Sequence, residues 1–271
     1  MSHWGNQFGI NTYSYTQSMS AADCVRALAE RGVRAVELMF FPGHLWITDS
    51  EETLRELRRV IEQCDVTLVS VNGPNVDLNI AAATSEMRDY SIKLNVEYLR
   101  VAAELNAKGL ILGPGKPNPL FSLPQDVMEG HFFRALDTLL PTAERGEVEL
   151  WAENMPFAFL PDAEGLMASL DRYGADSIGV CYDVANAHFI DEDPVAGFDR
   201  VRPRLKLVHL SDTGQKVYRH DAVGLGDVDF AAVTAKIKTL DLERPPMLEI
   251  ISRNADRDIA ESISTLANPA T

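Results

Sequence analysis

The sequence predicts one α/β domain over residues 1–271, a single (β/α)8 TIM barrel with its active site at the C-terminal ends of the strands. The chain has 271 residues, close to the ~250 residues that are typical of such a barrel. Short apolar runs alternate with longer amphipathic stretches, as parallel strands joined by crossover helices require. The last four apolar runs each end in a carboxylate or an imidazole, and active sites of these barrels lie at that end of the strands.

Eight apolar runs have the length of strands, at residues 8–11, 34–39, 66–71, 108–112, 149–153, 178–183, 205–209 and 246–249. Helices are predicted at residues 21–30, 51–63, 85–106, 129–145, 163–173, 194–201, 230–240 and 256–267. Ser20 stands where the first helix needs an N-cap. An open doubly wound sheet also alternates in this way, but it does not explain why polar groups end so many strands. No glycine-rich dinucleotide or phosphate fingerprint follows an early strand, since the nearest candidate, at residues 113–117, is interrupted by prolines.

The charge balance is strongly acidic, with 40 Asp and Glu against 25 Lys and Arg and a net charge of −15. A phosphate backbone is bound by basic surfaces, so nucleic acid is not the expected partner. The three cysteines, Cys24, Cys64 and Cys181, are odd in number and lie in or beside apolar runs, which favours buried reduced thiols. Neither a signal peptide nor a membrane span is recognised, so a cytoplasmic protein without a membrane partner is expected.

The polar residues that end the last four strands are Glu153, Asp183, His209 and Glu249. A carboxylate in the middle of an apolar strand would have to be desolvated at large cost, whereas at the strand end it points into the barrel mouth. Three carboxylates and one imidazole form a ligand set for one divalent metal ion, which favours Mn²⁺, Mg²⁺ or Co²⁺, with Zn²⁺ as an alternative. The sequence therefore predicts a metalloenzyme.

Ordered motifs along nearly the whole chain resemble the xylose isomerase-like TIM-barrel superfamily. This superfamily includes sugar isomerases, ketose 3-epimerases, inosose dehydratase-like proteins and metal-dependent abasic-site endonucleases. The motifs are AVEL at 35–38, AEN at 152–154, DVANAH at 183–188, VHLSD at 208–212, RHDAVGLGDVDF at 219–230 and LE at 248–249. The resemblance implies that Glu153, Asp183, His209 and Glu249 hold one cation. It also implies that Glu153 and Glu249 remove and return a proton on opposite faces of a metal-stabilised enediolate.

The function implied is that of a divalent-metal-dependent sugar or polyol isomerase or epimerase acting on a small molecule. An inosose-type dehydratase on the same barrel is the alternative, and the sequence does not discriminate between them. A barrel that only senses sugar, or serves as a scaffold, is a further alternative, and a homo-oligomer is compatible with the sequence.

Five residues are candidates for contact with the substrate or for ordering its pocket. The resemblance places His188 and Arg219 over the substrate oxygens, although Asn186 occupies the usual position of the histidine in the Asp-x-x-His motif. Glu37 is expected to order the pocket through hydrogen bonds rather than bind metal. Trp46 lies in an apolar loop that could cover a sugar or pack on another subunit, and Lys116 could reach a substrate carboxylate or enolate.

The endonuclease-like phosphodiesterases use three metal ions, and this sequence lacks several of the ligands they need. The residues that stand where those enzymes place metal ligands are Asn72, Gly113, Asn186 and Tyr218. We therefore expect His220 to be free of metal and hydrogen-bonded within its own loop, with Asp229 starting the next helix. Hydrolysis of nucleic acid is the less favoured interpretation.

Overall fold

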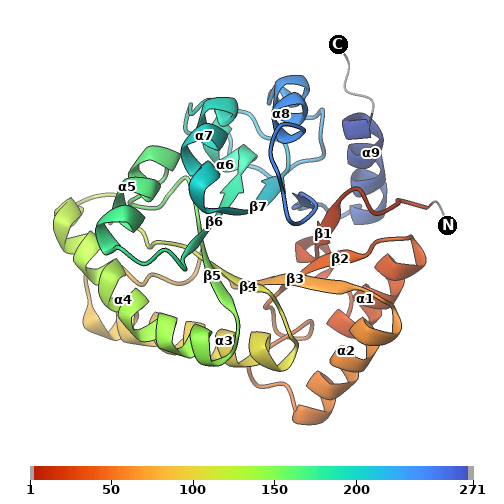
Figure 1. The fold of residues 1–271 in the computed structure, drawn as a ribbon, viewed down its shortest axis with the longest axis horizontal. Helices are drawn as coiled ribbons and strands as arrows, with labels where there is room; N and C mark the ends of the chain where they lie inside the picture. Colours follow the sequence, from red (N-terminus) through yellow and green to blue (C-terminus); the bar gives the residue numbers. More distant parts are fainter. Residues whose placement is uncertain (1–2, 268–271) are drawn as a thin grey trace.

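A computed structural model describes residues 3–267 of the chain. Its eight strands form a closed barrel in chain order, each parallel to the next, with β8 paired to β1 (Figure 1). The predicted (β/α)8 barrel is confirmed. The strands are β1 Gly9–Asn11, β2 Ala35–Met39, β3 Thr67–Asn72, β4 Gly109–Leu112, β5 Glu149–Glu153, β6 Gly179–Asp183, β7 Leu205–Leu210 and β8 Met247–Leu248.

Helices surround the barrel and connect its strands (Figure 1). They are α1 Ala21–Glu30, α2 Glu51–Gln63, α3 Ser85–Glu104, α4 Gln125–Arg145, α5 Ala163–Tyr173, α6 Val184–Phe189, α7 Pro194–Val201, α8 Phe230–Ile237 and α9 Ala255–Ala267, with short 3₁₀ turns at Tyr13–Tyr15 and Arg202–Arg204. The side chains of Ser20 and Asp229 accept backbone hydrogen bonds at the starts of α1 and α8, as N-caps do. None of the helices within residues 3–267 combines the length and apolar character needed to cross a bilayer.

Three predicted helices differ from the observed ones by two or more residues at one end, and one helix was not predicted. Helix α4 starts four residues before the predicted 129, because Pro124 supplies an extended residue at its N-cap. Helix α3 ends at Glu104, two residues before the predicted end, and Asn106 has a positive φ of 57° that a helix cannot continue through. Helix α8 ends at Ile237 rather than 240. The short helix α6 follows β6 without a loop, so the sequence has no turn residue there that would indicate the start of a helix.

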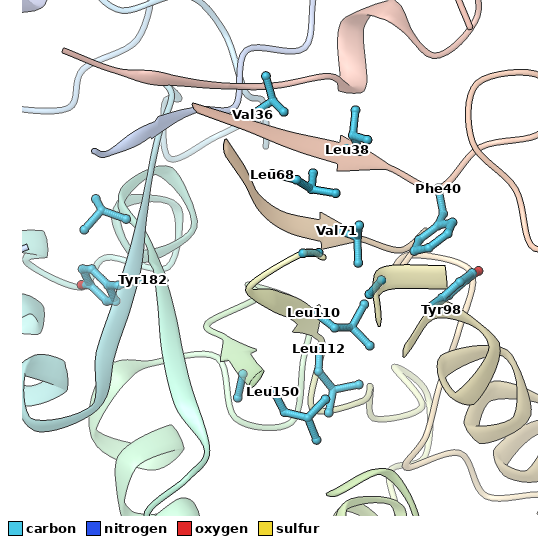
Figure 2. Packing of buried hydrophobic residues seen from close by; sticks show 14 of the residues in the cluster. Val36, Leu38, Phe40, Leu68, Val71, Tyr98, Leu110, Leu112, Leu150 and Tyr182 are labelled. Atoms are coloured by element: carbon cyan, nitrogen blue, oxygen red, sulfur yellow. The ribbon is translucent and has the colours of Figure 1, made fainter. Parts of the chain in front are cut away.

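The strands separate two apolar layers, because successive side chains of a strand point to opposite faces. The outward layer packs against the helices, and Figure 2 shows part of it, including Leu38 of β2, Leu110 of β4 and the stacked rings of Phe40 and Tyr98, whose centroids lie 4.2 Å apart. The inward layer fills the barrel and consists of Ala35, Val69, Ile111, Trp151, Cys181, Leu207 and Met247. The three cysteines are free thiols, with Cys24 and Cys181 buried and Cys64 partly buried.

Candidate metal centre

Four polar residues form the next inward layer, toward the carboxyl ends of the strands. Each lies two positions beyond a residue of the inward apolar layer, so strand alternation turns it to the same side. The pairs are Trp151 and Glu153, Cys181 and Asp183, Leu207 and His209, and Met247 and Glu249. The structure thus brings together the four residues that the sequence predicts as ligands.

The four side chains are buried and close enough to share one ion. Glu153, Asp183, His209 and Glu249 each offer one ligand atom, and these atoms all lie within 4.8 Å of one another. Nδ1 of His209 is 3.3 Å from Oε1 of Glu153, 3.2 Å from Oε2 of Glu249 and 3.8 Å from Oδ2 of Asp183. The imidazole therefore lies at the middle of three carboxylates.

Two atoms of this cluster have no hydrogen-bond partner among the described residues, although both are buried. They are Oδ2 of Asp183 and Nδ1 of His209. A buried polar atom without a partner is destabilising, and native proteins seldom leave one. A divalent cation between the two atoms would satisfy both, and the oxygen and nitrogen donors present are those that Mn²⁺, Mg²⁺ or Co²⁺ accepts. The residues present therefore fit a metal ion.

Glu37 of β2 orients the histidine of the cluster. Nε2 of His209 lies 3.2 Å from Oε1 of Glu37, whose carboxylate also accepts hydrogen bonds from Ser70 and Asn11. A carboxylate on one imidazole nitrogen fixes the ring and leaves the other nitrogen free for a metal. Glu37 is fully buried, and its carboxylate holds the His209 ring from the nitrogen that faces away from the other carboxylates.

Two asparagines fix Asp183 at the end of β6, and sequence reasoning gave a role to neither. The side chain of Asn154 accepts a hydrogen bond from the Asp183 N–H at 2.7 Å and donates one to its carbonyl at 2.9 Å. The Asp183 side chain caps α6, because Oδ1 accepts from the Asn186 N–H at 2.6 Å, and Oδ2 stays free. The sequence feature that could have indicated the role of Asn154 is its position directly after Glu153, at the end of a predicted strand.

Burial and mutual repulsion act on the carboxylates of the cluster. Burial raises the pKa of Glu153 to about 7, with further increases from Glu249 and Glu37. Burial also raises the pKa of Asp183 to about 7. Burial opposes ionisation of Glu249 too, but the nearby His209 and His220 outweigh it and lower the pKa of Glu249 to about 2. A cation would remove the repulsion among these groups.

His220 completes a hydrogen-bonded chain beside the cluster. Its Nδ1 lies 2.9 Å from the Ser211 hydroxyl and 3.4 Å from Oε2 of Glu249. Its Nε2 lies 2.6 Å from the Tyr218 hydroxyl, which donates to Oδ1 of Asn186 at 2.6 Å. Both ring nitrogens of His220 have partners within the loop that follows β7, as the sequence analysis expects. Tyr218 and Asn186 thus form one hydrogen-bonded chain with His220 beside the cluster.

Aromatic rings form a wall beside this chain. The ring centroids of Phe157 and Tyr218 lie 5.4 Å apart, those of Phe189 and Tyr218 5.2 Å apart, and those of Phe157 and Phe189 5.8 Å apart. Phe157, in the loop after β5, is 57% exposed. This wall could not be predicted from a local pattern, because its three rings come from the loop after β5, from the end of α6 and from the loop after β7.

The other predicted substrate residues lie around the cluster rather than in it. Nε2 of His188 pairs with Oδ1 of Asp227 at 2.6 Å. The Arg219 side chain is 61% exposed, with Nε 3.9 Å from Oδ2 of Asp221. His188 lies on α6, which directly follows β6, and Arg219 lies in the loop after β7, so both flank the mouth.

Lys116 and Trp46 are held by contacts of their own. Nζ of Lys116 donates to the backbone carbonyls of Asn75 and Val76, and burial lowers the pKa of this lysine. The Trp46 ring packs edge-on against Tyr98 of α3, with centroids 6.0 Å apart. In these positions Lys116 orders the loop after β3, and Trp46 packs with the outer apolar layer.

The chain belongs to the xylose isomerase-like TIM-barrel family, whose sequence model matches residues 25–268. An uncharacterized protein of Methanocaldococcus jannaschii is 22% identical over 241 residues, covering 86% of this chain and 80% of that protein. A probable endonuclease 4 of Mycobacterium ulcerans is 27% identical over 195 residues, covering 68% of this chain and 73% of that protein.

Solved structures share the fold over nearly the whole chain. A D-tagatose 3-epimerase-like protein superposes with a TM-score of 0.83 at 21% identity, covering 96% of this chain and 95% of that one. The probable 3-DHS dehydratase AsbF of Bacillus anthracis gives 0.79 at 16% identity, covering 97% and 99%. The IOLI protein, which binds a zinc atom, gives 0.77 at 15% identity, covering 96% and 95%.

Proposed function

We propose that this protein is a divalent-metal-dependent carbohydrate isomerase or epimerase that acts on a sugar or polyol by proton abstraction. The observation that carries the proposal is the pair of unpartnered buried atoms, Oδ2 of Asp183 and Nδ1 of His209, between the carboxylates of Glu153 and Glu249. Glu153, Asp183, His209 and Glu249 would hold the ion, for which we favour Mn²⁺. When bound, such an ion polarises a substrate carbonyl and acidifies the neighbouring C–H bond.

Glu153 and Glu249 are the proposed acid–base pair. Glu153 ends β5 and Glu249 directly follows β8. His209 lies between them, 3.3 Å from Glu153 and 3.2 Å from Glu249. One carboxylate can take the proton from one face of the substrate carbon, and the other, as a carboxylic acid, can donate its own proton to the opposite face. Asn11 donates to Oε1 of Glu249 at 3.2 Å, which fixes this carboxylate while its Oε2 faces the cluster.

The side chains at the mouth of the barrel suit a small polyhydroxy substrate with an apolar face. The wall of Phe157, Phe189 and Tyr218 offers rings to the C–H face of a sugar, and His188 and Arg219 offer donors at the rim. The structural neighbours include a D-tagatose 3-epimerase-like protein and a probable 3-DHS dehydratase, which supports chemistry next to a carbonyl. A dehydratase would use the same proton abstraction and then lose a hydroxyl group.

The similarity to a probable endonuclease 4 makes phosphodiester hydrolysis a second candidate. Within residues 3–267, the groups of potential ligands are Glu153–Asp183–His209–Glu249 and Glu153–Cys181–His209, which overlap. Because these two groups share Glu153 and His209, they offer few ligands for a centre of three metal ions. The net charge of −15 also opposes binding of a phosphate backbone.

Proton exchange in D₂O tests the proposal. Candidate ketoses and inososes are incubated with the Mn²⁺-loaded protein, and deuterium incorporation is followed by NMR and mass spectrometry. Metal-dependent exchange at one carbon supports the proposal, and product lighter by one water identifies a dehydratase. The metal-free protein and Glu249→Gln are the controls. A broad panel without metal-dependent exchange contradicts the proposal. Cleavage of an abasic-site oligonucleotide in a separate incubation would favour hydrolysis instead.

A further inference from the structure

A buried thiol lies directly beneath the candidate metal centre. Cys181 is on β6, two residues before Asp183, and belongs to the inward apolar layer. It is 0% exposed. With Glu153 and His209 it forms a second group of potential ligands, whose ligand atoms lie within 4.8 Å of one another. The thiol therefore shares two of its neighbours with the four-residue cluster.

The shared imidazole is the second observation at this position. His209 is fully buried, and its Nδ1 has no hydrogen-bond partner among the described residues. Glu37 holds the ring from its other nitrogen, so the ring cannot turn away to satisfy Nδ1. A cysteine sulfur, an imidazole nitrogen and a carboxylate oxygen are the donors that Zn²⁺ and softer ions select.

We propose that the centre offers two overlapping cation positions, an upper one for a hard ion and a deeper one for a thiophilic ion. The upper position uses Glu153, Asp183, His209 and Glu249. The deeper position exchanges Asp183 and Glu249 for the thiolate of Cys181. Binding there breaks the S–H bond, forms a sulfur–metal bond and releases the proton to solvent.

The two positions exclude each other, because both use Glu153 and His209. A thiophilic ion thus displaces Mn²⁺ and occupies the acid–base residue Glu153, so it inhibits rather than activates. This inference rests on the proposed metal centre, but it does not depend on which reaction the protein catalyses.

Cadmium binding to the metal-free protein tests the deeper position. A Cd²⁺–thiolate bond absorbs in the ultraviolet, and we expect this absorption to saturate at one ion per chain and to disappear when Mn²⁺ is added in excess. Cys181→Ala should abolish it and weaken Cd²⁺ binding by about tenfold or more, with Mn²⁺ affinity unchanged. Cys64→Ala is the matched control and should keep the absorption.

A double variant, Cys24→Ala with Cys64→Ala, leaves Cys181 as the one cysteine of the chain and decides the matter if Cys181→Ala does not fold. It should keep the whole absorption. Absence of the absorption there or in the wild type, its survival in Cys181→Ala, or simultaneous binding of Cd²⁺ and Mn²⁺ overturns the inference. If Mn²⁺ binds but Cd²⁺ gives no thiolate absorption, the inference fails and the proposed centre stands. If Cd²⁺ binds Cys181 and Mn²⁺ does not bind, the proposed function fails instead.

Discussion

Oε1 of Glu37 lies 3.2 Å from Nε2 of His209, and both side chains are fully buried. The contact joins β2 to β7 across the barrel interior. It fixes the imidazole from behind, with Nδ1 turned toward three carboxylates. The geometry of the candidate metal centre therefore depends on Glu37, which lies outside the four-residue cluster.

Glu37→Gln should weaken Mn²⁺ binding by about 10–100-fold, since loss of the negative charge makes His209 a poorer ligand. Calorimetric titration of the metal-free protein measures the change. Glu30→Gln, on the exposed end of α1, is the control and should bind Mn²⁺ as the wild type does. Wild-type affinity in Glu37→Gln would show that the contact does not support the metal site.

Asp183→Asn and Glu249→Gln should respond differently to added metal. An amide is a weaker ligand than a carboxylate, so Asp183→Asn should lose activity at low Mn²⁺ and recover part of it at high Mn²⁺. Glu249→Gln cannot accept the substrate proton and should stay about 10²-fold or more below the wild type at saturation. Activity against Mn²⁺ concentration separates the two, and equal rescue would contradict the distinct roles.

The stabilisation by Mn²⁺ should be larger at pH 8 than at pH 6. Burial raises the pKa of Glu153 and of Asp183 to about 7, above their ordinary values of 4.5 and 3.8. The stability that these groups contribute to the metal-free protein is therefore lost as the pH rises through 7. A bound cation removes that loss of stability. At pH 8 it also competes less with protons for the carboxylates than at pH 6.

Thermal unfolding with saturating Mn²⁺ and with chelator, at both pH values, measures this difference. A double variant, Glu153→Gln with Asp183→Asn, should show little dependence of the metal effect on pH. An equal or larger increase in Tm at pH 6 would contradict the assignment.

His220→Ala should leave the metal content at about one ion per chain, because both nitrogens of His220 already have hydrogen-bond partners. Plasma mass spectrometry of the purified variant measures this. Tyr218→Phe, which removes one hydroxyl from the same chain, should behave alike. Loss of half or more of the bound metal would reveal a second metal site and favour hydrolysis.

Phe157→Ala should raise the KM for the substrate found by proton exchange with little change in Tm, since this ring is 57% exposed and packs on Phe189 and Tyr218. Phe121→Ala is a suitable control, because Phe121 is 90% exposed on the loop before α4. If both variants had the same KM, the aromatic wall would not be part of the substrate-binding site.

The barrel and the four candidate ligands could be predicted from local sequence patterns. Alternation of apolar and polar residues is a local property of each strand, and a polar residue two positions beyond an inward apolar one must face the same side. His209, two residues after Leu207, is an example. The boundaries of α3, α4 and α8 were less well predicted, because a helix end depends on single residues such as Pro124 and Asn106.

The partners of these ligands were decided by the tertiary structure alone. The register of β2 and β3 shifts between the pairs Val36–Leu68 and Glu37–Ser70, which places the Ser70 hydroxyl against the Glu37 carboxylate. The stagger of the closed barrel then sets Glu37 behind His209, 172 residues away in the chain. Such contacts depend on strand register and barrel closure, which no local pattern encodes, and they determine which nitrogen of the histidine faces the metal site.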